Sequence, residues 1–210
     1  MNIYRLRVNY VTTATPAYPK LNSAVKFYAA PFCVYPFAVT ELDQFWANEL
    51  AQALEKAKAA GRNDIADYLT LRASNDFLRS SAVKWLMRSF IDLAEEFRLT
   101  GKTISLETDT KHSFRVGHST MAGSRVSFRY GVRALTIEAG WTRTPEHGFM
   151  RGNSLAHAKV SHFGMTKANK ELVLVKTNDS PLWLVQEDEQ IRTPLFEDFF
   201  HANFSFLLSD

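Results

Sequence analysis

The stretch RVSFRYGVRALTIEAGWTRTPEHGFMRGNSLAHAK, residues 125–159, decides the fold class. Its polar and apolar residues alternate on both sides of Gly131 and again after Asn153, and a period of two is typical of strands. The phase of the alternation changes at Gly131, which indicates a hairpin turn or a bulge there. Connections this short leave no room for crossover helices, so the strands are expected to pair antiparallel.

Alternating segments of the same kind continue on both sides of this stretch. The predicted strands are 103–107, 113–116, 125–130, 132–139, 154–160, 172–176 and 182–186. Their regular spacing and the turn residues between them predict a meander.

The first half of the chain is mainly helical in pattern. After a predicted strand at residues 2–11, apolar residues recur at helical spacing over 40–60, 63–73 and 75–99, with Gly61 and Gly101 as stop signals. Leu42, Phe45, Leu50, Leu54 and Ala57 are expected to form the buried face of the first of these helices, together with Trp46. A last helix is predicted to start near Pro194.

These elements predict an α+β protein: an N-terminal strand and helical region (three helices), then a largely antiparallel meander sheet and a C-terminal helix. We expect a single domain over residues 1–210, with the helical part at about 40–100 and the sheet part at about 101–190.

Composition indicates a globular protein, with 46% hydrophobic and 22% charged residues. The single cysteine, Cys33, excludes an intrachain disulfide and favours a reducing compartment. The N-terminus lacks the apolar core of a signal peptide, and the longest apolar run, 27–39, is shorter than the roughly 20 residues that cross a bilayer. The expectation is a soluble, cytoplasmic protein without a membrane partner.

Charge is distributed unevenly along the chain. Residues 101–170 hold eleven basic and four acidic residues, a net charge of +7, whereas residues 171–210 have a net charge of −6. A basic block can form an anion-binding surface. Alternatively, the acidic C-terminal block packs against it and neutralises it.

Our main hypothesis is a binding protein for an anionic partner such as nucleic acid. Arg125 and Arg129 share one face of their strand, and guanidinium groups bind oxyanions with two hydrogen bonds. The long loop 140–152 adds further cations and a tryptophan, and loops held by a sheet often carry binding sites. The candidate anion-binding residues are Arg125, Arg129, Arg133, Arg143, Arg151 and Trp141.

A metal-dependent phosphodiesterase or nuclease-like hydrolase is the alternative. Glu138, followed on the next strand by Lys159, resembles the arrangement in metal-dependent nucleases, where carboxylates hold Mg²⁺ or Mn²⁺ and a lysine steadies the attacking water. The candidate metal ligands are Glu107, Asp109 and Glu138, and the candidate catalytic residues are Glu138, His147, His157 and Lys159. No phosphate-binding glycine loop, serine-hydrolase elbow or dinucleotide fingerprint is present.

A third hypothesis is self-assembly into a homo-oligomer through the phenylalanine-rich C-terminal segment. Its aromatic residues are Phe196, Phe199, Phe200, Phe204 and Phe206.

Overall fold

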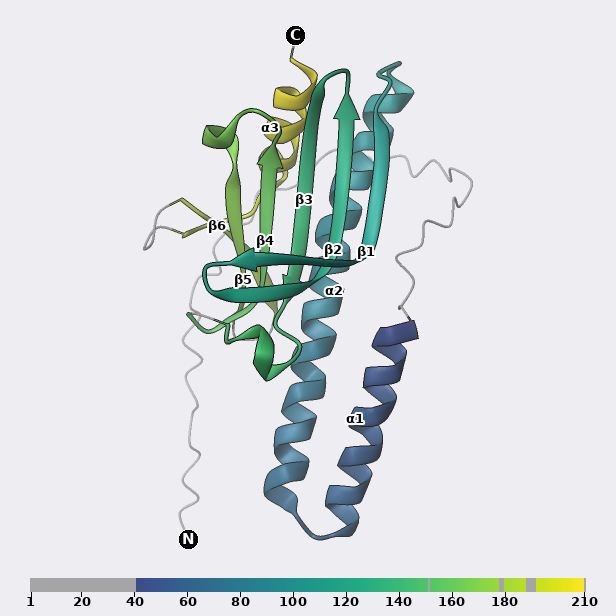
Figure 1. Ribbon diagram of the computed structural model, residues 1–210, viewed down its shortest axis with the longest axis vertical. Helices are drawn as coiled ribbons and strands as arrows, with labels where there is room; N and C mark the ends of the chain where they lie inside the picture. Colours follow the sequence, from purple (N-terminus) through teal and green to yellow (C-terminus); the bar gives the residue numbers. More distant parts are fainter. Residues whose placement is uncertain (1–40, 151, 178–179, 188–191, 210) are drawn as a thin grey trace, which may run out of the picture. The chain divides into compact units, whose positions relative to one another are not determined.

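A seven-stranded antiparallel sheet forms the framework, and helices precede and follow it in the chain (Figure 1). The computed structural model describes residues 41–150, 152–177, 180–187 and 192–209, all of which belong to one unit, Pro36–Asp210. The predicted strand at 2–11, Cys33 and the apolar run 27–39 lie outside the described residues.

Each strand of the sheet pairs with the next one in the chain, so the predicted meander is confirmed. Gly131, with φ 58°, lies in the tight turn that joins the second strand to the third, as the change of phase predicted. The strands are β1 (Ser105–Val116), β2 (Ser119–Tyr130), β3 (Arg133–Trp141), β4 (Ser154–His162), β5 (Lys170–Lys176), β6 (Pro181–Gln186) and β7 (Arg192–Pro194).

Two predicted strands, 103–107 and 113–116, are parts of the single long strand β1, which contains an irregularity between Asp109 and His112. The short strand β7 was not predicted, because three residues are too few to show an alternation. Two short 3-10 turns, η1 (Pro145–His147) and η2 (Thr166–Ala168), flank β4 in the chain.

The helices are α1 (Glu41–Ala59), α2 (Asn63–Leu99) and α3 (Glu197–Leu208). The prediction of two separate helices within 63–99 was wrong, because Ala73 and Ser74 supply neither a glycine nor a proline to interrupt the backbone hydrogen bonds. The C-terminal helix is confirmed, but it begins at Glu197 because Pro194 pairs with β6 as part of β7.

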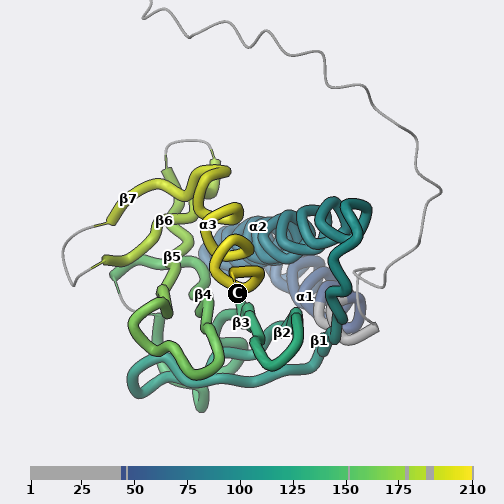
Figure 2. Tube along the Cα trace, turned by 90° about the horizontal axis from the view of Figure 1, so that it is seen from above, coloured from purple at the N-terminus to yellow at the C-terminus, as the bar shows by residue number. Residues whose placement is uncertain are grey.

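One face of the sheet packs on the second half of α2 and on α3, and Figure 2 shows the strands curving around these helices. Aromatic rings pack edge to face in this core. Phe90 lies 4.8 Å from Phe200 and Phe128 lies 5.2 Å from Phe204, measured between ring centroids. The sheet contributes alternate residues, including Val126, Phe128, Leu135, Ile137, Ala158, Val160, Leu172, Leu174 and Val185. The opposite face of the sheet therefore carries the polar residues of the same strands.

The first half of α2 and the whole of α1 form a helical hairpin with little buried surface. Ala57 and Ala66 are buried in it, but Phe45 is 56% exposed, so its expected place in a buried face was wrong. The reason is that α1 packs mainly against α2 and has no sheet beneath it. None of the helices in the described ranges is both long enough and apolar enough to cross a membrane.

Candidate functional site

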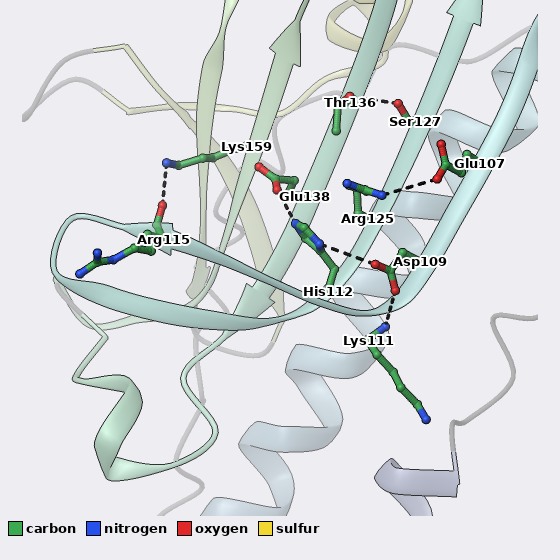
Figure 3. Close-up of polar contacts among 10 residues, drawn as sticks. All are labelled: Glu107, Asp109, Lys111, His112, Arg115, Arg125, Ser127, Thr136, Glu138 and Lys159. Carbon is green, nitrogen blue, oxygen red and sulfur yellow. Dashed lines mark hydrogen bonds and ion pairs between the residues drawn. The ribbon is translucent and has the colours of Figure 1, made fainter.

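A row of alternating charges crosses the face of the sheet that is turned away from α2. Register places Asp109 beside Arg125, Arg125 beside Glu138, Glu138 beside Lys159, and Lys159 beside Glu171. We call these five residues the charge ladder, most of which is drawn in Figure 3. Opposite charges on neighbouring strands stabilise a sheet by roughly 0.2–1 kcal/mol per pair.

The two cations of the ladder are held by carboxylates. Arg125 Nη2 lies 3.6 Å from Glu107 Oε1, and Lys159 Nζ lies 3.7 Å from Glu171 Oε1. Glu107 belongs to the basic block itself, while Glu171 comes from the acidic C-terminal block. Neutralisation of these cations therefore occurs within the sheet, between neighbouring strands.

Beyond the ladder, β1 and β2 leave the plane of the sheet together. The hairpin that they form, residues 112–123, turns across the polar face in front of β3, β4 and β5 (Figure 1), and we call it the strap. It is tied down at β4, where Lys159 Nζ donates a 2.7 Å hydrogen bond to the Arg115 carbonyl. Near its end, Ser119 Oγ donates to the Phe149 carbonyl at 3.0 Å.

Two glycines make the crossing possible. A Cβ added to Gly123 would lie 1.9 Å from the Ala139 carbonyl oxygen, and one added to Gly140 would lie 2.7 Å from the Ala122 carbonyl oxygen. The backbones of β2 and β3 thus meet where the strap leaves the sheet, and a side chain at either position would push them apart.

His112 joins the strap to the charge ladder. Its Nε2 lies 2.5 Å from Glu138 Oε1, and its Nδ1 lies 3.7 Å from Asp109 Oδ2 (Figure 3). The imidazole also stacks on Phe114, with ring planes 8° apart and centroids separated by 6.2 Å. Sequence reasoning did not single out this residue, because its partners come from another strand and from beyond a bulge.

A second buried region lies outside the main core. Phe114 and Met121 of the strap are buried, as is Val173 on the polar face of β5. His157 is buried too, and its Nε2 lies 3.0 Å from Ser154 Oγ. The strap is thus seated on the sheet by apolar burial as well as by hydrogen bonds.

Burial lowers the pKa of His157 below its usual value, because the charged imidazolium loses water. The carboxylate of Glu171 opposes this shift, whereas the positive charges of Arg192 and Lys159 add to it. The neutral form of the ring is therefore favoured at this largely buried position.

The predicted metal ligands are occupied by contacts within the protein. Glu107 faces Arg125, Glu138 faces His112, and Asp109 accepts a 3.0 Å hydrogen bond from the Lys111 backbone. Throughout the ranges that the structure describes, no three His, Cys, Asp or Glu side chains are grouped so that they could hold a metal ion. A Mg²⁺- or Mn²⁺-dependent hydrolase stays a prediction.

The predicted catalytic residues are divided between two places. Glu138 and Lys159 are neighbours in the charge ladder, and His157 lies one row away on the same face. His147, in η1, instead accepts a 3.3 Å hydrogen bond at Nδ1 from the Arg143 backbone and so holds its own loop.

The predicted anion-binding arginines also lie apart. Arg133 Nη1 donates to the Phe206 carbonyl at 3.1 Å and to Ser209 Oγ at 2.6 Å, and so caps the end of α3. Arg143 lies 4.6 Å over the ring of Trp141. Arg129 is exposed on the polar face of β2, and Arg151 lies outside the described residues.

Arg129 and two further cations face solvent. Residues 110–137 contain five Lys or Arg residues and no Asp or Glu. Lys111, Arg115 and Arg129 are exposed, and in the part of the chain that the structure describes no carboxylate forms an ion pair with them. Arg129 was predicted as an anion-binding residue, and reading the charge of this segment by itself would have added Lys111 and Arg115. Only the structure shows that Arg125 and Arg133 have partners.

Comparison of the chain with protein-family models, with curated proteins and with solved structures found no match. A role for the protein is therefore argued from the geometry of its own residues.

Proposed function

We propose that the protein is a binding protein for a polyanion and that the outward side of the β1–β2 hairpin makes the contact. The observation that carries this proposal is a set of exposed cations with which no carboxylate of the described residues forms an ion pair: Lys111, Arg115 and Arg129. His118, at the tip of the strap, is exposed as well. Such cations gain most from a phosphate or sulfate group, because no carboxylate within the described residues is paired with them.

The charge ladder supports this assignment because its own cations are already paired with carboxylates. Arg125 and Lys159 already face carboxylates, so binding an anion there would require breaking an ion pair on a partly covered face. The exposed cations Lys111, Arg115 and Arg129 need no such exchange. In Figure 3 the side chains of Lys111 and Arg115 point away from the ladder.

The proposal is tested by measuring the binding of labelled nucleic acid or labelled heparin. Fluorescence anisotropy at several salt concentrations gives the affinity. We expect salt-sensitive binding by the wild-type protein and a clear loss with the double variant Lys111→Glu/Arg115→Glu. The dependence on salt should also become shallower for duplex DNA, by about 0.9 in the log–log slope for each phosphate contact removed.

Lys167→Glu/Lys170→Glu is the matched control, since it changes the net charge equally in η2 and at the first residue of β5, outside the strap. If both double variants weaken binding by the same factor, net charge alone explains the affinity and the strap has no special role. Absence of salt-sensitive binding by the wild-type protein would refute the proposal as a whole.

A further inference from the structure

Phe149 is an exposed aromatic residue in a loop that contacts the strap. Its side chain is 82% exposed, and it lies in the loop between β3 and β4. A ring this exposed leaves its faces open to a ligand.

The loop is held against the strap by its backbone. The Phe149 carbonyl accepts the hydrogen bond from Ser119 Oγ. A Cβ added to Gly148 would lie 2.8 Å from Ser119 Oγ. Gly148, with φ 88°, permits this close approach. The strap end and the exposed phenylalanine are therefore neighbours, although thirty residues separate Ser119 from Phe149 in the sequence.

An exposed aromatic ring together with exposed lysine and arginine side chains matches the chemistry of one class of polyanion. Single-stranded nucleic acid offers phosphates to Lys or Arg and unpaired bases whose faces stack on aromatic side chains. In a duplex the bases are stacked on one another and their faces are closed, and heparin has no bases at all. Only the single strand would use both features of this surface.

We infer that the polyanion bound by the strap is single-stranded nucleic acid and that an unpaired base stacks on Phe149. This inference rests on the proposed function, because the phosphates would be held by Lys111 and Arg115.

The experiment compares three probes on the full chain: an unstructured labelled single strand, the same strand annealed to its complement, and labelled heparin. We expect Phe149→Ala to weaken single-strand binding by about fivefold or more, as for loss of one stacked base, and to leave duplex and heparin binding within about twofold of wild type. Phe163→Ala is the control, because Phe163 is 76% exposed but follows β4, at the opposite end of that strand from Phe149.

Each outcome decides between the two claims. Binding of none of the probes by the wild-type protein refutes the proposed function and this inference together. If Phe149→Ala lowers the affinity for the single strand, the duplex and heparin equally, or lowers none of them, base stacking on Phe149 is overturned. The proposed polyanion-binding function is not contradicted by either result. Equal effects of Phe149→Ala and Phe163→Ala overturn the assignment of the site. Thermal unfolding of both variants shows whether they are folded, which their exposure leads us to expect.

Discussion

At the scale of single residues, Gly123 and Gly140 hold the position where the strap leaves the sheet. Gly123→Ala is expected to destabilise the protein by about 3 kcal/mol, since its Cβ would lie 1.9 Å from a backbone oxygen that belongs to a paired strand. Chemical denaturation measures this.

Gly131→Ala is the contrasting variant. Its Cβ would meet no atom within 4 Å, but its φ of 58° is unfavourable for alanine, so a smaller loss of about 1 kcal/mol is expected. If Gly123→Ala cost no more than Gly131→Ala, the close approach of β2 and β3 would not be a constraint on the fold.

His157 gives a residue-scale prediction for pH. Its pKa in the folded protein is lowered below the usual 6.5, so below that pH the unfolded chain binds a proton that the folded protein does not bind. Stability should therefore fall as the pH decreases from about 6.5 towards the folded pKa, and it should level off below that pKa.

The variant His157→Gln should show a weaker fall over the same range, because glutamine does not titrate. Urea unfolding at a series of pH values compares it with His118→Gln, which removes an exposed imidazole from the strap tip. Identical pH dependence in the two variants would contradict a role for the buried histidine.

At the scale of elements, the strap is expected to open separately from the rest of the sheet. Glu138→Gln removes the charge that faces His112 and should destabilise the strap by about 1 kcal/mol, since the hydrogen bond between the two side chains loses its charged acceptor. Hydrogen exchange should become faster for amides of residues 112–123 and change little in β4 and β5, whose pairing is untouched.

A double-mutant cycle with His112→Gln and Glu138→Gln separates the energy of the contact between the two side chains from the effect of each substitution elsewhere in the protein. The two losses should be non-additive by roughly 0.5 kcal/mol or more, as for residues in direct contact. Additive losses would show that the short contact between the two side chains carries no coupling.

At the scale of the whole molecule, α3 closes the main core. Phe204→Ala is expected to cost about 3–5 kcal/mol, because Phe204 is fully buried against Phe90, Phe97 and Phe128. Phe196, which is 67% exposed, should tolerate alanine within about 0.5 kcal/mol.

Of the five phenylalanines proposed for self-assembly, Phe200 and Phe204 are buried, Phe199 and Phe206 are half-buried, and Phe196 is exposed. Phe196 is therefore the residue with which to test that hypothesis. Light scattering of Phe196→Ala beside the wild-type protein measures the mass of each. A wild-type oligomer that dissociates in this variant would support assembly through the C-terminal segment, and unchanged mass would count against it.

The sequence by itself determined the antiparallel meander, the hairpin at Gly131 and the presence of a C-terminal helix. These features depend on the spacing of apolar residues and on turn residues, and both can be read from positions that are close in the sequence. It also located the positive charge, but it could not say which arginines have acidic neighbours.

Only the tertiary structure decided the charge ladder, the strap and the place of Phe149 beside it. The ladder depends on strand register, and a shift of one residue would turn Arg125 and Glu138 to the other face. The strap depends on a bulge in β1 and on a glycine pair whose partners lie on different strands. Contacts between distant segments arise from packing, so no pattern within one segment could predict them.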